Sequence, residues 1–234
     1  MDRLDARFTP AVSRRIAQAS RQMVDMFEHT GEVGIAPDHY GQIEDEFKRM
    51  AETAALVFGG RIIEQGKAAG FVLERKEGFA DMMARLAMQY IAQEAIRRRI
   101  TSIAETTRNR IVSLVEQGYE AGFGQQEIAR TIRDRIPSMS LVRGALIART
   151  EVHGAAQFGA DSAARSAGLQ LRKEWVASGD ERTRRDHRRA DGQVVGMDEP
   201  FIVGGERLMY PGDSAGRADQ TINCRCVHSF IVVD

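Results

Sequence analysis

The sequence predicts a mainly α-helical N-terminal part followed by a small α+β C-terminal domain. From Thr9 to about Gly124 the apolar residues recur at helical spacing, with hardly any of the alternation that marks strands. Beyond Gly168 the spacing changes to period two, which is typical of a half-buried strand. We therefore expect a helical arm over residues 1–124 and a separate α+β domain over residues 125–234.

Length, charge and cysteine content narrow the class of protein. A chain of 234 residues can bury a core without disulfides. Its 33 basic and 33 acidic residues cancel, so no global positive field draws it to nucleic acid or to an anionic membrane. Cys224 and Cys226 are too close in sequence for an unstrained disulfide, and no apolar run approaches the ~20 residues of a spanning helix. We expect a soluble protein with free thiols, made in the cytoplasm and without membrane contact.

Two helices are expected first. Thr9 and Pro10 form a good N-cap and first-turn pair, so the first helix should start there and end before Gly31. A second should open at Pro37 and end or kink at the glycine pair that begins with Gly59.

A long third helical segment runs from Phe79 to Gly118. At ~1.5 Å per residue, an unbroken helix of this length would be a rod of roughly 60 Å, more like a spacer than a core helix. Arg97, Arg98 and Arg99 form the densest basic run and could contact DNA phosphates. We favour the simpler interpretation that they solvate an outer helix face.

The rod should be separated from the C-terminal domain by a hinge at Gly122 and Gly124. A short helix over Gln125–Arg135 should stop at Pro137, because proline disrupts a helix interior. Ser140 should then cap another helix that ends at Gly168.

The expected elements after Gly168 are short. They are a strand over Leu169–Val176, a charged turn or short helix over Asp180–His187, a turn at Asp191 and Gly192, a strand at Val194 and Val195, a loop over Met209–Gly216, and a final strand over Ile222–Val233 with a break near Ser229.

Four short signatures follow one another in the second half of the chain. They are Ile147, Ala148, Arg149, Thr150 and Glu151; Lys173, Glu174 and Trp175 with Asp180, Glu181, Arg182, Thr183, Arg184 and His187; Asp191 and Gly192 with Pro200 and Phe201; and Tyr210, Pro211, Gly212, Asp213 and Ser214 with Ile222, Asn223, Cys224, Arg225 and Cys226. Each alone is common by chance, but all four in order resemble the domain of the phage Mu F-like minor head protein family, also called phage head morphogenesis proteins. The resemblance starts near Gly122 and covers somewhat under half of the chain. His153 departs slightly from the family pattern.

The resemblance implies a non-enzymatic virion protein present in few copies. It further implies association with the portal in the capsid interior, a role in head assembly, DNA packaging or ejection, and contact with portal, capsid or scaffold proteins and with packaged DNA. The helical first half matches no motif.

The spacing of the two cysteines suggests a metal site. Residues two apart on an extended strand face the same way, so Cys224, Cys226 and His228 would share one side, and His187 could complete a zinc site of about four ligands. Against zinc, Cys-x-Cys is not the usual two-residue-gap knuckle, and buried thiols are common core residues. Both interpretations stay open, and we favour packing with no cofactor.

The signature polar residues also allow two interpretations. His187 with Glu151 or Asp191 could carry acid-base chemistry, as in a small nuclease or an ADP-ribosyltransferase-like enzyme. We favour a hydrogen-bonded lattice that fixes loops, because no nucleophile-plus-base spacing or phosphate-binding glycine loop is present. A third hypothesis is a DNA-contacting module that uses Arg97, Arg98 and Arg99 together with Arg182, Arg184, Arg185, Arg188 and Arg189.

Overall fold

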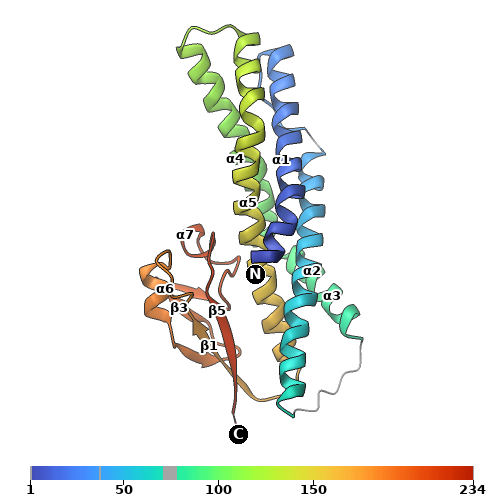
Figure 1. Ribbon diagram of the computed structural model, residues 1–234, viewed down its shortest axis with the longest axis vertical. Helices are drawn as coiled ribbons and strands as arrows, with labels where there is room; N and C mark the ends of the chain where they lie inside the picture. Colours follow the sequence, from blue (N-terminus) through green and yellow to red (C-terminus); the bar gives the residue numbers. More distant parts are fainter. Residues whose placement is uncertain (1, 37, 71–77, 234) are drawn as a thin grey trace. The chain divides into compact units, whose positions relative to one another are not determined.

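The computed structural model describes residues 2–36, 38–70 and 78–233 (Figure 1). Long helices come first and short strands follow, so the expected fold class is confirmed. The helices are α1 (Asp2–Thr30), α2 (His39–Ala68), α3 (Phe79–Ala92), α4 (Glu94–Glu120) and α5 (Gln125–Arg165), followed by the short α6 (Arg185–Ala190) and α7 (Ala218–Thr221). Within the described ranges, no helix combines the length and hydropathy that a membrane-spanning segment needs.

Contacts between residues group the chain into two compact units, which we call the helical unit and the sheet unit. The helical unit contains residues 2–47 and 96–148, and the sheet unit contains residues 48–95 and 149–233. The expected division between residues 124 and 125 is therefore not the one that the contacts give. The reason is that α2 and α5 each contribute residues to both units.

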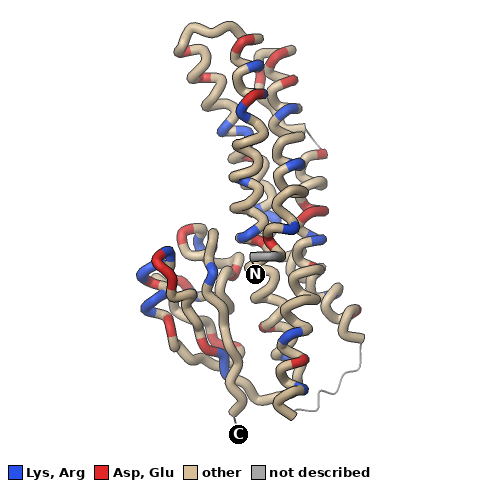
Figure 2. Tube along the Cα trace, viewed as in Figure 1, with Lys and Arg blue, Asp and Glu red and all other residues tan. Residues whose placement is uncertain are grey.

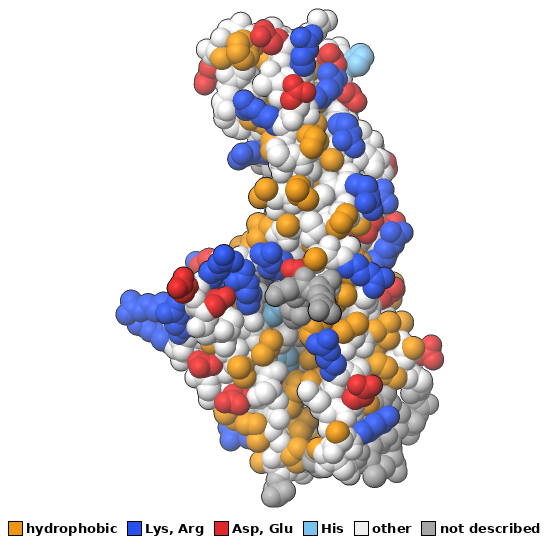
Figure 3. Space-filling model, in the orientation of Figure 1, with side chains coloured by type: hydrophobic (Ala, Val, Ile, Leu, Met, Phe, Trp, Pro, Cys, Tyr) orange, Lys and Arg blue, Asp and Glu red, His pale blue; other side chains and the backbone are white. Residues whose placement is uncertain are grey.

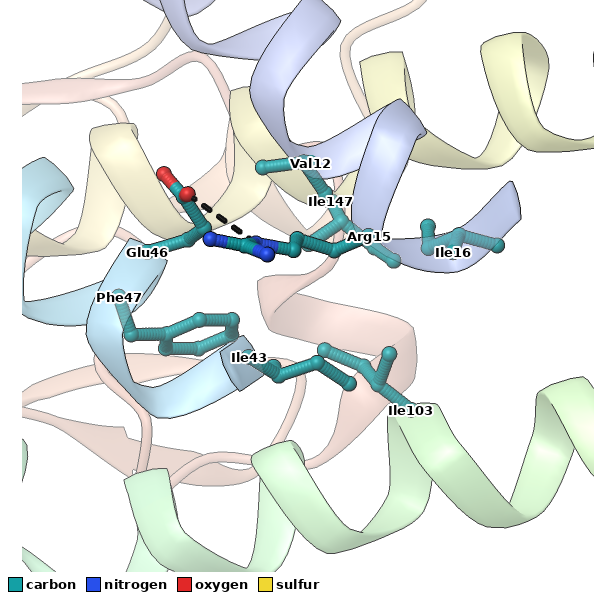
Figure 4. A pocket seen from close by; sticks show the side chains of 8 residues that line it. All are labelled: Val12, Arg15, Ile16, Ile43, Glu46, Phe47, Ile103 and Ile147. Atoms are coloured by element: carbon teal, nitrogen blue, oxygen red, sulfur yellow. Dashed lines mark ion pairs between the residues drawn. The ribbon is translucent and has the colours of Figure 1, made fainter. Parts of the chain in front are cut away.

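The core of the helical unit lies between α1, α4 and the first part of α5, which run side by side in Figure 1. Charged residues of both signs are interspersed along these helices (Figure 2), as expected for solvated faces. A cavity of about 10 Å³ remains beside the Arg15–Glu46 ion pair, with Nε and Oε1 3.5 Å apart (Figure 4). It has room for one water at most, so it is a packing defect and not a ligand site.

The predicted start of the first helix is wrong. Helix α1 begins at Asp2, and the Thr9 hydroxyl donates to the Asp5 carbonyl oxygen at 3.0 Å instead of capping a helix end. The predicted end is confirmed, because α1 stops at Thr30 and Gly31 has a φ of +79°. The expected start at Pro37 lies outside the described residues.

The predicted break at Gly59 is also wrong, because α2 continues to Ala68. A Cβ on Gly59 would lie 2.6 Å from the Met83 sulfur, and one on Gly159 of α5 would lie 2.7 Å from the Ala55 Cα. These glycines allow close helix packing within the sheet unit, and that packing keeps the helix intact.

The predicted unbroken rod is wrong as well. Gln93 interrupts it with an extended ψ of 134°, so that α3 and α4 are separate helices. The Gln93 side-chain oxygen accepts a hydrogen bond from the Ser214 hydroxyl at 3.1 Å. This contact is long-range, so no local sequence signal marks the break.

Proline 137 does not end a helix, contrary to expectation. Helix α5 runs through it without interruption, and Ser140 lies in its interior. Ile132 and Ile136 are at most 2% exposed, and burying them offsets the ~3 kcal/mol that an interior proline costs. The predicted break after the rod is confirmed as a turn between α4 and α5, where Gly122 has a φ of +80°. The predicted role of this turn as a hinge between two domains is wrong, because it lies within the helical unit.

The sheet unit contains a three-stranded antiparallel sheet with β1 in the centre. Strand β1 (Leu171–Val176) pairs with β2 (Val194–Gly196) and with β5 (Val227–Val232), and a separate hairpin joins β3 (Phe201–Val203) to β4 (Glu206–Leu208). The strands expected near β1 and β2 are confirmed. The last strand begins five residues later than expected, and Ser229 pairs with Glu174 instead of breaking it. The sequence did not predict β3, β4 or α7, which are four residues or fewer.

Candidate functional site

His187, Cys224 and Cys226 converge in the interior of the sheet unit. Helix α6 carries His187, and both cysteines lie in the segment just before β5. The His187 Nδ1 is 3.4 Å from the Cys226 sulfur and 3.7 Å from the Cys224 sulfur, and the three atoms lie within 4.8 Å of one another. All three residues are at most 2% exposed. The structure therefore brings together three of the four predicted metal ligands.

The second ring nitrogen of His187 is held by a residue that the sequence did not single out. The His187 Nε2 lies 3.0 Å from the Gln220 side-chain oxygen, and Gln220 is buried on α7. An amide oxygen only accepts, so Nε2 carries the hydrogen and Nδ1 presents a lone pair to the two sulfurs. An amide in a four-residue helix has no periodic signal, which explains why it was missed.

The two thiols differ in acidity. A hydrogen bond from Cys224 holds the pKa of Cys226 well below its ordinary value. The same interaction with Cys226, together with burial, raises the pKa of Cys224. The Trp175 ring meets His187 edge-on at 5.5 Å and Phe201 at 5.4 Å, so apolar rings cover one side of the cluster.

His228, the fourth predicted ligand, lies apart from the cluster. Its Nδ1 is 2.8 Å from the Gln157 side-chain oxygen and its Nε2 is 3.8 Å from an Asp161 carboxylate oxygen. The prediction assumed one continuous strand through Cys224 and Cys226. Since β5 begins only at Val227, the two-residue periodicity does not carry His228 to the side of the thiols.

The segment before the cysteines is held by the start of the family signature on α5. The Arg149 guanidinium donates to the Asn223 side-chain oxygen at 3.2 Å, and the Asn223 N–H donates to the Thr150 hydroxyl at 3.1 Å. The Arg184 guanidinium donates to the Ile222 carbonyl at 2.6 Å. Asn223 has a φ of +58°, a left-handed conformation that asparagine tolerates better than most residues.

Asp180 fixes the loop before α6. One carboxylate oxygen accepts from the Arg182 N–H at 3.1 Å and the Thr183 hydroxyl at 2.9 Å, and the other accepts from the Arg225 guanidinium at 3.2 Å. The bond from Thr183 is the main reason why the pKa of Asp180 is lowered. Arg225 thus links this loop to the cysteine segment.

The remaining signature residues shape turns. An Asp191 carboxylate oxygen accepts from the Ala177 N–H at 2.8 Å, and Asp213 accepts from the Met209 N–H at 2.8 Å. Gly192 and Gly212 have φ values of +75° and +80°, and Pro211 beside Gly212 is buried.

The hydrogen-bonded signature residues described above are together called the frame. A buried lysine lies next to it. Lys173 is 0% exposed, and its ammonium donates to the Met209 carbonyl at 2.8 Å and lies 3.9 Å from an Asp161 carboxylate oxygen. Residues two apart on a strand face the same way, so the position of Lys173 two residues before Trp175 could have predicted that this lysine is buried. Glu151 is buried on α5.

The predicted basic run lies on α4 in the helical unit, where Arg97 and Arg98 are exposed and Arg99 is half-buried. A second group of exposed arginines, Arg185, Arg188 and Arg189, lies on α6. On the face shown in Figure 3, basic side chains gather over the part of the sheet unit that holds α6.

The frame and the cluster define a small α+β domain fixed by polar contacts, and comparison with known proteins places it in a family. The model of the phage Mu protein F like family matches residues 109–229, which contain all four signatures. The chain belongs to this family.

Three curated proteins are similar to this chain, and one of them is named as a minor head protein. The chain is 34% identical to minor head protein GP7 of Bacillus phage SPP1 over 53% of this chain and 41% of that protein. It is 28% identical to the NAD(+)–arginine ADP-ribosyltransferase EFV of Enterococcus faecalis over 69% of this chain and 35% of that protein. It is 29% identical to protein YqbB of Bacillus subtilis over 54% of this chain and 42% of that protein. The chain thus spans less than half the length of each relative, and no solved structure matches it significantly.

Proposed function

We propose that this chain acts as a structural minor head protein in phage head morphogenesis and becomes part of the virion. The observation that carries the proposal is the family match over residues 109–229, joined by the 34% identity to a protein named as a minor head protein. The site supports it, because the signature residues contact backbone groups and one another. Such contacts fix loops and leave little for a substrate to bind.

We further propose that the chain contacts the portal protein from the capsid interior through its helical unit. Leu141 and Val142 on α5 are 57% and 74% exposed. Adjacent large apolar side chains in water suit a protein–protein contact. Contact with capsid or scaffold proteins, or with packaged DNA through the arginines of α4 and α6, stays a prediction.

A binding experiment tests the portal contact. We expect purified portal rings to retain the chain on a sizing column, and the double variant Leu141→Glu, Val142→Glu to lose at least tenfold in affinity. Ile202, an apolar residue that is 49% exposed in the sheet unit, provides the matched control Ile202→Glu, which should bind normally. Equal binding by all three proteins would rule out this docking surface, and the absence of wild-type binding would rule out the portal as partner.

We propose that the chain itself is not an enzyme. His187, the base in the alternative hypothesis, is 1% exposed, and both of its ring nitrogens lie against Gln220, Cys224 or Cys226. The relative named as an ADP-ribosyltransferase is covered over only 35% of its length, so its name does not transfer. Purified protein should consume neither NAD⁺ nor nucleic acid. A turnover that His187→Ala abolishes would contradict this proposal.

A further inference from the structure

We propose that His187, Cys224 and Cys226 bind one zinc ion, which joins α6 to the segment before β5. The ring of His187 and the two thiol groups meet at one buried point, although α6 and the cysteines are more than thirty residues apart in sequence. The role of the ion would be structural.

The distances from the His187 nitrogen to the two sulfurs fit tetrahedral zinc. With Zn–N and Zn–S bonds of about 2.0 and 2.3 Å, a tetrahedral angle separates the nitrogen from each sulfur by roughly 3.5 Å. The observed separations are 3.4 Å to Cys226 and 3.7 Å to Cys224. Both nitrogen–sulfur distances are therefore already close to those of a zinc-bound imidazole and thiolate.

The hydrogen bonding of His187 also fits a metal ligand. Metal-bound histidines usually donate their other ring N–H to an acceptor, which fixes the ring and the free lone pair. Gln220 provides this acceptor, at 3.0 Å from Nε2. Simple packing of two thiols would not require a histidine whose lone pair is directed at both sulfurs.

The chemistry of the donors selects the ion. Two soft thiolates and an imidazole suit zinc and do not suit Mg²⁺ or Ca²⁺, which prefer oxygen ligands. Two thiolates also neutralise a divalent ion, which lowers the cost of burying the site. Among the described residues, no fourth His, Cys, Asp or Glu joins the group, so we assign the fourth position to a water molecule.

An ion here would add stability where the apolar core is small. The apolar cluster around the site contains Trp175, Phe201 and Leu208 as its large members. Binding energy from a preformed site contributes directly to folding. Loss of the ion should therefore lower the melting temperature of the sheet unit.

The test is metal analysis and cobalt spectroscopy of the full chain, produced without a histidine tag. We expect one zinc per chain by elemental analysis after growth with added zinc. Apo-protein titrated with Co²⁺ should develop the intense visible bands of a tetrahedral thiolate site and saturate at one equivalent. Zinc should then displace the cobalt and raise the melting temperature.

Substitutions of the proposed ligands test whether zinc binds at this cluster. Cys226→Ser and His187→Ala should each weaken binding at least tenfold, whereas His228→Gln should retain one zinc, because His228 is buried outside the cluster. The wild-type titration decides the question even if a ligand variant fails to fold. Wild-type protein that neither contains zinc nor develops cobalt bands would overturn the proposal, as would full binding by folded Cys226→Ser.

Discussion

At the scale of single residues, the structure explains why the family signature combines charged groups with two cysteines. Arg149, Thr150 and Arg184 hold the backbone around Asn223, which brings Cys224 into position. The sequence predicted that these polar residues form a frame, because their types lack a catalytic arrangement. It did not predict their pairings, since contacts across seventy residues leave no local pattern.

Asn223 provides a direct test of the frame. Replacing it with alanine should lower the free energy of unfolding by about 1–2 kcal/mol, because a β-carbon without a polar side chain is strained at positive φ. Asn223→Gly should lose less, since glycine adopts this φ freely and only the bond from Arg149 is lost. Urea unfolding measures both. Asn109→Ala, at an exposed position on α4, is the control, and an equal loss in the alanine and glycine variants would contradict the role of φ.

Two buried histidines predict a dependence of stability on pH. Burial lowers the pKa of His153 from 6.5 to about 4 and that of His228 to about 3. Below pH 6.5 the unfolded chain takes up protons that the native chain does not, so stability falls as the pH falls. Each histidine should contribute about 1.4 kcal/mol per pH unit until its folded pKa is reached.

Urea unfolding of metal-free protein from neutral pH down to about pH 4 measures this slope. We expect a shallower slope for His153→Gln. Stability that stays constant over this range in the wild-type protein would show that these histidines are not buried in neutral form.

At the scale of elements, proline and glycine residues that usually break a helix did not do so where tertiary packing stabilises the helix. Pro137 and Gly59 both lie inside continuous helices, because Ile132, Ile136 and the contact with Met83 stabilise the helical path. The real break at Gln93 has no local signal and coincides with a hydrogen bond from Ser214. Helix and strand types were therefore predictable from periodicity, and their ends were less so.

Glycine substitutions distinguish packing from flexibility. Gly159→Ala should lower the free energy of unfolding by about 1–3 kcal/mol, because the new Cβ would lie 2.7 Å from the Ala55 backbone. Gly41 lies on α2 with open space around it, so Gly41→Ala should raise stability by about 0.5–1 kcal/mol. Thermal and urea unfolding give both values. Equal effects in the two variants would contradict the close approach of α2 and α5 at Gly159.

At the scale of the whole molecule, composition and periodicity predicted long helices followed by a small α+β domain, and the ordered signatures predicted the family. The division into the helical unit and the sheet unit was not predicted, because α2 and α5 each contribute residues to both units. A linear reading of the chain assigns each helix to one domain. It cannot anticipate units built from segments that are distant in sequence.

The central claim is that this family member is a structural part of the phage head. Mass spectrometry of purified heads, from phage with the gene intact and with the gene deleted, tests it most directly. We predict that the intact heads contain the chain at far lower abundance than the major capsid protein, and that heads lacking it show defects in assembly, packaging or ejection. Heads that never contain the chain, and that remain fully infectious without the gene, would contradict the claim.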